Sequence, residues 1–471
     1  MILTDSGKKY KIEFEELERR VFDMCMSEGR AIMSEIMSEL DEQLFKNCDK
    51  KVYKSEGRRK TNLKTLMGAV DYSRRVYRTP DESGGNDFVF LLDEMLGIDA
   101  PGKMSNVVST LIATSACESD YREVSEKVST LSGLSISHTT AWSVTQAVGA
   151  RVLEHGEELA TRAKNNAGTG QIESNILFEE LDGVWLKLQG ESRKRLGHSK
   201  EMKVAIAYDG IKEMPGGRRR LSDKVACASF EGVKDFIELK EGVIASVYNV
   251  DEIELRVLNG DGASWISAQT DADTIYQLDP FHRNRAIRKF VNDPDLCREM
   301  LTLLYNQEID MLLKVIDASI NSTEDEYEQE KRKALYNYFN NNKDALTSYT
   351  SRGVDIPEVN PGLLSGTCGA MESNVFTMVG NRMKGGRESW SVEGANHLAA
   401  LLCLKQTGRL EHTLSVMGEK MPSAQFKGIL SAAKAHEKVG KGYSGFKRAK
   451  IPNMSWIKGF LGLKPLSKLR F

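Results

Sequence analysis

The sequence predicts a multidomain protein that mixes helices and strands, with a mixed five-stranded sheet at the centre of its largest domain. Three observations support this prediction. At 471 residues the chain exceeds the roughly 250–300 residues at which a single core stops growing. Between residues 172 and 293, strand-length apolar runs alternate with helical segments. Residues 294–365 then carry charged, helical patterns without a strand signal.

Composition narrows the class of protein. The net charge of −2 does not by itself predict a nucleic-acid partner. The seven cysteines occur singly, without a Cys-x-x-Cys pair, which argues against a zinc site and a disulfide framework. We find neither a signal-peptide pattern nor an apolar stretch near the roughly 20 residues that cross a bilayer. We therefore expect a cytoplasmic protein without a membrane partner.

Residues 1–98 are expected to form a small α+β module. The first 45 or so residues have helical periodicity, and Asp71–Tyr77 alternates like a strand. Basic residues crowd the segment Arg58–Lys60. Contact of these residues with DNA and a purely structural role are equally compatible with the pattern.

Residues 99–165 are expected to be helical. Gly133 interrupts the pattern, and Ser137 is a plausible N-cap for the helix that follows. Two helices joined by a short Gly-containing turn match a helix-turn-helix, whose second helix would enter the major groove. Thr139 and Thr140, early in that helix, would then contact bases or phosphates. Any helical hairpin produces the same pattern, so an ordinary structural role stays open.

The central region begins after a polar, Gly-containing segment, Thr161–Glu173, which indicates a linker. Three strands, a helix, then strand, helix and strand are predicted there, which is the order of an RNase H-like core with a mixed sheet. The strands are expected at 177–188, 202–208, 224–230, up to 258 and around 274–278, and the helices at 235–248 and 263–268.

Three further regions complete the predicted organisation. A helical insertion at 294–365 precedes the last helices of the core at 366–405. A basic tail at 406–471 ends the chain. From Ala424 onward it holds eleven Lys or Arg residues and one acidic residue, Glu437.

Three carboxylates form the candidate metal site. Asp182 lies on the first predicted strand, and Asp261 lies just beyond the fourth. These strands are central neighbours in the predicted sheet, so the two carboxylates can converge. Glu372 begins a later helix that would pack across the sheet. Carboxylates suit Mg²⁺ or Mn²⁺, and two such ions can flank a phosphodiester during in-line displacement. Each acid alone could instead be a turn residue or a helix-terminus charge.

Other glutamates compete for a place in this site. Glu393 is the main rival of Glu372 as the third acid, and the sequence does not decide between them. On the first strand, Glu180 would face the same side as Asp182, whereas Glu179 would face away.

A basic segment follows the fifth strand. His282 lies near the expected metal site, where it could hydrogen-bond a phosphate or a leaving oxygen, or only cap the strand end. An exposed basic helix face would look the same as a phosphate-binding surface. The candidate phosphate contacts are Arg283, Arg285, Arg382 and Arg387.

Several of these segments resemble the ISLre-type insertion-sequence transposases, close to the Mutator-like DDE group. The resemblance is colinear from Tyr72 to Leu404, and its most specific element is Gly-Asp-Gly-Ala-Ser-Trp-Ile at residues 260–266. It implies Asp182, Asp261 and Glu372 as the DDE triad. The chain departs from the family's Glu-Gly-His after Glu372, and from its Ser-Arg-Pro before Trp390. The other similar segments are 181–185 with Lys187, 121–124, 203–210, 279–282, 382–391 and 394–395.

The resemblance implies a DNA transposase with metal-dependent strand cleavage and strand transfer. The N-terminal module and the helix-turn-helix would bind the terminal inverted repeats, and the basic tail would add affinity for phosphate. Joining two ends and the target DNA would need a homo-oligomer, located in the cytoplasm at the nucleoid. Two alternatives stay open: a structure-selective nuclease of RNase H-like fold, and a domesticated DNA-binding regulator without catalysis.

Overall fold

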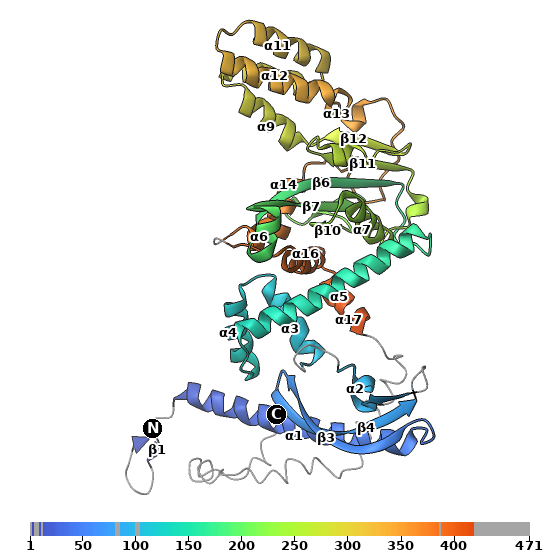
Figure 1. The fold of residues 1–471 in the computed structure, drawn as a ribbon. Coiled ribbons are helices and arrows are strands. Elements are labelled where there is room, and N and C mark those ends of the chain that lie inside the picture. The colour runs from blue at the N-terminus through green and yellow to red at the C-terminus, as the bar shows by residue number, and fades with distance from the viewer. Residues whose placement is uncertain are drawn as a thin grey trace. The chain divides into compact units, whose positions relative to one another are not determined.

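The computed structural model of the chain describes residues 2–3, 9–10, 13–80, 85–98, 104–366, 368–385 and 388–418 (Figure 1). The chain divides into two compact units. We call them unit 1 (Met1–Val108, Glu126–Ile136 and Gly418–Phe471) and unit 2 (Ser109–Ser125 and Ser137–Met417). Among the described residues, no helix combines the length and the apolar character that a membrane span requires.

Unit 1 confirms the predicted helix followed by strands. Its core is formed by the side chains of Met37, Leu63, Val70, Tyr72 and Leu92. Its elements are β1 (Ile2–Leu3), β2 (Lys9–Tyr10), α1 (Phe14–Asn47), β3 (Lys54–Thr65), β4 (Gly68–Pro80), β5 (Asn86–Val89) and α2 (Leu91–Leu96), with β3, β4 and β5 in one antiparallel sheet.

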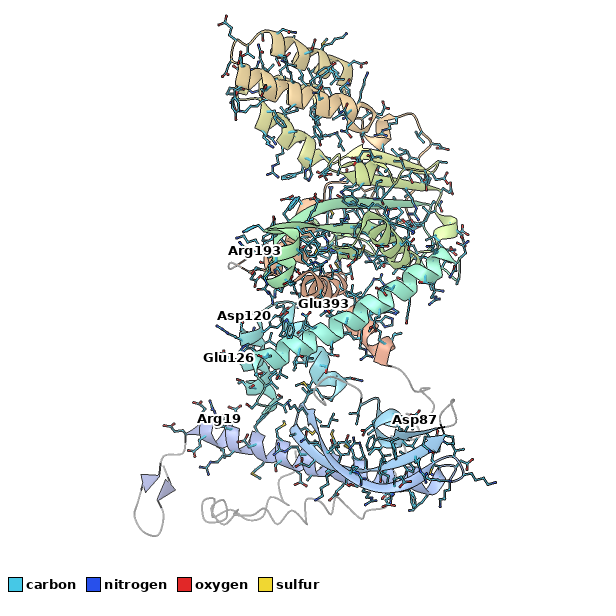
Figure 2. All side chains as sticks on the ribbon, in the orientation of Figure 1. Arg19, Asp87, Asp120, Glu126, Arg193 and Glu393 are labelled. Carbon is cyan, nitrogen blue, oxygen red and sulfur yellow. The ribbon has the colours of Figure 1, made fainter. Side chains whose placement is uncertain are left out.

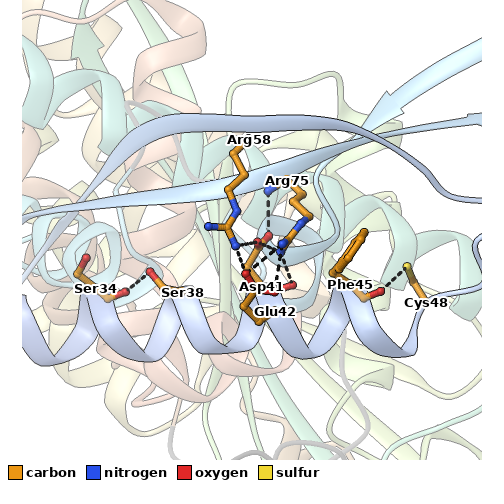
Figure 3. Close-up of polar contacts among 8 residues, drawn as sticks. All are labelled: Ser34, Ser38, Asp41, Glu42, Phe45, Cys48, Arg58 and Arg75. Atoms are coloured by element: carbon orange, nitrogen blue, oxygen red, sulfur yellow. Dashed lines mark hydrogen bonds and ion pairs between the residues drawn. The ribbon is translucent and has the colours of Figure 1, made fainter.

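A charged cluster joins α1 to the sheet of unit 1 (Figure 3). Asp41 is 1% exposed and accepts hydrogen bonds from the backbone and the guanidinium of Arg75 at 2.8 and 2.5 Å. Arg58 pairs with Glu42, and Arg75 lies 4.2 Å over the ring of Phe45. Arg58 therefore has an intramolecular partner, and DNA contact by this basic segment stays a prediction.

Three helices follow: α3 (Asn106–Ala116), α4 (Tyr121–Ser132) and α5 (His138–Lys164). The predicted N-cap is confirmed, because the Ser137 hydroxyl accepts the Thr140 N–H at 3.1 Å. Helix α5 packs against the core of unit 2 through small residues. A Cβ on Gly149 would lie 2.6 Å from the Cβ of His397, and one on Gly156 would lie 2.9 Å from Leu239.

The centre of unit 2 is a mixed five-stranded sheet of order β10-β7-β6-β11-β12. Strand β7 runs antiparallel to β6 and β10, while β6, β11 and β12 run parallel to one another. The five strands lie close to the predicted positions: β6 (Ile176–Lys187), β7 (Ser199–Tyr208), β10 (Val225–Ser229), β11 (Leu255–Gly260) and β12 (Thr274–Leu278).

The segment interpreted as a linker is packed against the sheet domain, so that interpretation is wrong. Helix α5 continues to Lys164. Ile172 then pairs with Tyr248, and a Cβ on Gly170 would lie 2.0 Å from the backbone of Val247. Gly170 therefore does not mark a free connection but allows two backbones to approach closely.

The connections between strands hold several smaller elements. The helix predicted at 235–248 is present as α7 (Val233–Ala245), which packs on β10, and α8 (Ser264–Ser267) follows β11. The turn expected after β7 contains an unpredicted hairpin, β8 (Ile211–Met214) and β9 (Arg218–Leu221), and α6 (Gly190–Leu196) joins β6 to β7.

The region predicted to be a helical insertion contains helices α10 to α13, which share an apolar core with α9 and with Leu278 of β12. Helices α9 and α12 pack together, and α13 contacts β12. Ile287, Leu312, Ile316, Leu335 and Phe339 are fully buried between these helices. The elements of this region are α9 (Pro280–Phe290), α10 (Pro294–Tyr305), α11 (Ile309–Asn321), α12 (Glu326–Asn341), α13 (Lys343–Leu346) and η3 (Tyr349–Ser351). The short η2 (Val250–Glu252) lies earlier in the chain, between α7 and β11.

The last helices return to the sheet. Helix α14 contacts β6 and β7, and α16 packs on β10 and α5. A π-helical stretch, η4 (Phe376–Gly380), connects α14 to α15 without a break. These elements are α14 (Met371–Val375), α15 (Asn381–Met383), α16 (Val392–Gln406) and α17 (Leu410–Gly418).

Candidate metal centre

Three side chains of unit 2 form one potential metal-ligand group. One ligand atom from each of Asp182, His282 and Glu372 lies within 4.8 Å of the other two. The residues come from β6, α9 and α14, which are far apart in sequence. The sheet thus gathers two of the predicted acids and the predicted histidine.

Asp182 is held at its place in the middle of β6. It is 7% exposed, and its Oδ1 accepts the N–H of Gly183 at 2.7 Å. Its Oδ2 lies 3.6 Å from His282 Nε2. One oxygen is therefore fixed by the backbone while the other faces the remaining members of the group.

His282 is placed by the start of α9. Asp279 caps this helix by accepting the N–H groups of Phe281 and His282 at 2.7 and 3.2 Å, and Pro280 occupies the first turn. Burial lowers the pKa of His282, but the hydrogen bond and charge of Asp182, with the charges of Asp279 and Asp261, outweigh it. The pKa of His282 is therefore raised above its ordinary 6.5.

Replacing Asp182 with Asn should lower the pKa of His282 in the metal-free protein. The substitution removes the negative charge next to the imidazole but leaves the burial that disfavours the imidazolium. A titration of the His282 ring protons by NMR gives both values. An Asp295→Asn control changes an exposed acid of α10 and should leave the His282 pKa unchanged. Equal pKa values in the wild type and Asp182→Asn would contradict this account.

Glu372 lies in the first turn of α14, as predicted. The N-cap residue of this helix, Ala370, has no capping side chain. Glu180 of β6 substitutes for one, because its Oε2 accepts the N–H groups of Gly369 and Met371 at 2.8 and 3.1 Å. The strand that carries Asp182 therefore also fixes the helix that carries Glu372.

One buried amide connects the two helix starts. Asn259 Nδ2 of β11 donates to Glu180 Oε2 at 3.3 Å and to Asp279 Oδ2 at 2.7 Å. Asn259 and Glu180 are both fully buried, and Tyr208 donates to the other oxygen of Glu180 at 2.7 Å. Burial and the charge of Asp279 raise the pKa of Glu180, whereas the hydrogen bonds from Tyr208, Gly369 and Met371 lower it. This network positions Glu372 and His282 without itself supplying a ligand.

Replacing Glu180 with Gln should weaken metal binding by about 10- to 100-fold, the usual effect of losing a partner behind the ligands. Gln keeps the size of the side chain, but it cannot accept at both oxygens from Tyr208, Gly369, Met371 and Asn259. Calorimetric titration with Mn²⁺ measures the change. Glu191→Gln, on the exposed helix α6, is the matched control and should bind as the wild type does. Wild-type affinity in Glu180→Gln would exclude the positioning role.

Asp261 lies beside the group but is not one of its three members. Its Oδ1 accepts the N–H of Ala263 at 2.9 Å, so the carboxylate closes the turn before α8. Burial and the charge of Asp182 raise the pKa of Asp261, while the Ala263 N–H and the charge of His282 lower it. Asp261 thus interacts electrostatically with the group. The third member of the group is His282 and not, as predicted, Asp261.

Glu201 of β7 is a fourth nearby carboxylate that the sequence interpretation missed. Burial raises its pKa, and the charges of Asp261 and Asp182 raise it further. A Cβ on Gly183 would lie 2.2 Å from Glu201 Oε1, so this glycine makes room for a carboxylate. No sequence signal pointed to Glu201, because its position beside Gly183 depends on the pairing of β6 with β7.

The remaining candidate site residues lie outside the metal-ligand group. Glu393, labelled in Figure 2, is exposed in the first turn of α16 and is not in the group. Arg283 donates to Leu346 O at 2.9 Å, and Arg382 donates to Ala116 O and Glu388 at 2.8 and 2.9 Å. Both arginines thus have intramolecular partners, and their contact with phosphate stays a prediction. Arg285 is exposed on α9 and remains a candidate.

Two expectations concern residues outside this centre. Thr139 is exposed at the start of α5, and Thr140 forms part of the Ser137 cap, so DNA contact by this turn stays a prediction. Arg387 lies outside the described residues, and so does the basic tail beyond residue 418.

The donor set fits a divalent cation. Carboxylates suit Mg²⁺ and Mn²⁺, and an imidazole adds affinity for Mn²⁺ and the later transition metals. Asp182, His282 and Glu372 would hold one ion. Asp261 and Glu201 supply further negative charge nearby.

Comparison with known proteins identifies relatives along most of the chain. A family model described as "Uncharacterised protein family (UPF0236)" matches residues 8–420. A UPF0236 protein in the vanSb 3′ region of Streptococcus gallolyticus is 23% identical over 425 residues, covering 87% of each chain. A UPF0236 protein of Caldanaerobacter subterraneus, whose name joins eleven locus designations, is 23% identical over 399 residues, covering 83% of this chain and 78% of its own.

Proposed function

The chain belongs to the UPF0236 family, and from its candidate metal centre we propose that it is a DDE-type DNA transposase. Its chemistry would be metal-dependent cleavage and transfer of DNA strands. The observation that carries the proposal is the convergence of Asp182 and Glu372 at one metal-ligand group on a five-stranded mixed sheet.

The topology of the sheet supports an RNase H-like assignment. In order of sequence its strands are arranged 3-2-1-4-5, and the second strand is the antiparallel one. Asp182 lies on the first strand and Asp261 follows the fourth, its neighbour.

The relatives support a mobile element. The name of one Caldanaerobacter relative joins eleven locus designations, as expected for a sequence that is copied within a genome. For this chain, we infer an element that moves by strand cleavage, with DNA as the substrate and a homo-oligomer as the active form.

Each residue has a defined task in this proposal. Asp182, His282 and Glu372 hold a divalent ion, which when bound polarises the phosphodiester and lowers the pKa of a bound water. Asp279, Asn259 and Glu180 keep the helix starts in place. Because these residues act as ligands or position the ligands, catalysis depends on positioning and charge neutralisation.

A strand-specific cleavage assay tests the proposal. DNA carrying the sequences that flank the coding region should be nicked at defined ends when Mg²⁺ or Mn²⁺ is present, and left intact when EDTA is added. Cleavage that is insensitive to chelation would refute the proposal. Cleavage of branched DNA of any sequence would favour the structure-selective nuclease, and end-specific binding without cleavage would favour the domesticated regulator.

A further inference from the structure

A basic cavity lies along α14, the helix that carries Glu372. Its volume is about 660 Å³, within the range of ligand-binding pockets. Its walls are the β8–β9 hairpin, the start of α14 and the turn between α16 and α17. Ala370 and Ser373, which flank Glu372 in sequence, belong to the lining. The cavity and the candidate metal centre therefore share helix α14, although none of the lining residues is a member of the metal group.

Positive charge dominates the lining. One lining residue, Asp223, is acidic, and the basic ones lie on three separate segments of unit 2. The hydroxyl groups of Ser222, Ser373 and Thr407 also lie in the lining, but they donate to Asp223, to Ala370 O and to Cys403 O, so the free donors of the cavity are its cationic side chains. The basic lining residues are Lys212, Arg219, Arg220, Lys224 and Arg409.

Two of these cationic side chains, those of Lys224 and Arg409, are partly buried in the wall of the cavity. Lys224 Nζ donates to Asn374 Oδ1 of α14 at 2.8 Å, and burial together with the like charge of Arg220 lowers the pKa of Lys224. Arg409 Nε is buried without a hydrogen-bond partner among the described residues. Like charges held this close together would be stabilised by an anion between them.

We propose that this cavity binds the phosphates of one DNA strand and leads that strand to the metal centre. The inference rests on the proposed function, which makes DNA the substrate. Several cations spread over a concave surface match a chain of phosphates better than one small anion, because each Lys or Arg can neutralise a separate phosphate. The hairpin supplies Lys212 and Arg220 as directly paired residues of β8 and β9, so two adjacent charges face the strand together.

Binding of a labelled single-stranded oligonucleotide to the full chain, in EDTA and over a range of salt, tests the proposal. The variant Lys212→Gln/Arg220→Gln removes two exposed charges. It should lose about tenfold in affinity at low salt. Its salt dependence should become shallower by about 1.4, at roughly 0.7 per cation for single strands. Lys212→Arg/Arg220→Lys keeps the charge and should bind as the wild type does.

Arg298→Gln/Lys333→Gln, on exposed positions of the insertion, is the control for a general change of charge. The basic tail is the same in all variants, so differences in DNA affinity between the variants measure the contribution of the cavity. Unchanged affinity and salt dependence in Lys212→Gln/Arg220→Gln would overturn the proposal. So would inorganic phosphate that competes equally well with and without the two charges, since the site would then be elsewhere. Because no metal is present, this result is independent of whether the chain cleaves DNA.

Discussion

Asp182→Asn should reduce metal-dependent DNA nicking by about a thousandfold or more, which corresponds to roughly 4 kcal/mol of lost transition-state stabilisation. Asp182 is the residue of the metal group that the sheet itself holds. Asparagine has nearly the same shape and can still accept the Gly183 N–H, so the fold should persist. What is lost is the charge that the ion and His282 require.

The measurement is the initial rate of nicking in Mn²⁺ at saturating DNA. DNA affinity in EDTA should stay at the wild-type value, because Asp182 does not line the basic cavity. Asp295→Asn, exposed on α10, controls for loss of an acid and should nick normally. Nicking by Asp182→Asn within a fewfold of the wild-type rate would exclude the candidate centre as the site of catalysis.

Lys240→Met should lower the free energy of unfolding of unit 2 by about 3–5 kcal/mol, the usual effect of breaking a buried ion pair. Lys240 is 5% exposed on α7 and pairs with Glu179 of β6, which is 2% exposed. Arg256 also contacts Glu179, at 2.9 Å. Methionine fills the space of lysine but leaves Glu179 buried with one cation fewer.

Urea denaturation followed by tryptophan fluorescence measures this change, because Trp142, Trp185, Trp265 and Trp390 all lie in unit 2. Lys164→Met is the matched control, since Lys164 pairs with Glu238 of the same helix α7 on the surface. Its loss should cost no more than about 1 kcal/mol. Equal free energies of unfolding of Lys240→Met and Lys164→Met would show that burial adds nothing to the stabilisation from the Lys240–Glu179 pair.

The same network predicts a dependence of stability on pH. Burial opposes ionisation of Glu179, yet Lys240 and Arg256 hold its pKa below the ordinary 4.5. The stabilisation from Glu179 is thus complete above pH 4.5 and is lost as the pH falls through the lower pKa of the folded state. Lys240→Met should have a smaller loss of stability in this acid range than the wild type. An identical acid profile would contradict the pairing.

The sequence was sufficient to predict the positions of elements whose side chains alternate between the core and the surroundings. The five sheet strands are long apolar or alternating runs, so their positions were predicted well. The β8–β9 hairpin was missed because its two strands are only four residues each and mostly exposed, which leaves no hydrophobic period. Gly170 misled the interpretation of Thr161–Glu173, since a glycine needed for close backbone packing looks the same in a sequence as one in a loop.

The candidate site was predictable as a set of residues but not as a geometry. Glu372 and Glu393 both lie early in helices, and only the fold shows that Glu180 ties one of these helices to β6. The roles of Asn259 and Glu201 depend on pairing between distant segments, which a single sequence does not display. Asp261 was placed in the group because it follows a central strand, whereas the turn before α8 occupies one of its oxygens.

The helical insertion has a consequence for how such proteins can diversify. Helices α10 to α13 pack among themselves, on α9 and on β12, and the two ligand-bearing helix starts, those of α9 and α14, are linked through the side chain of Asn259. Changes of length within the insertion, or a foreign domain fused into the α11–α12 turn, should therefore leave the three ligands in register. Relatives can acquire new surfaces at this point while the chemistry at the sheet stays the same.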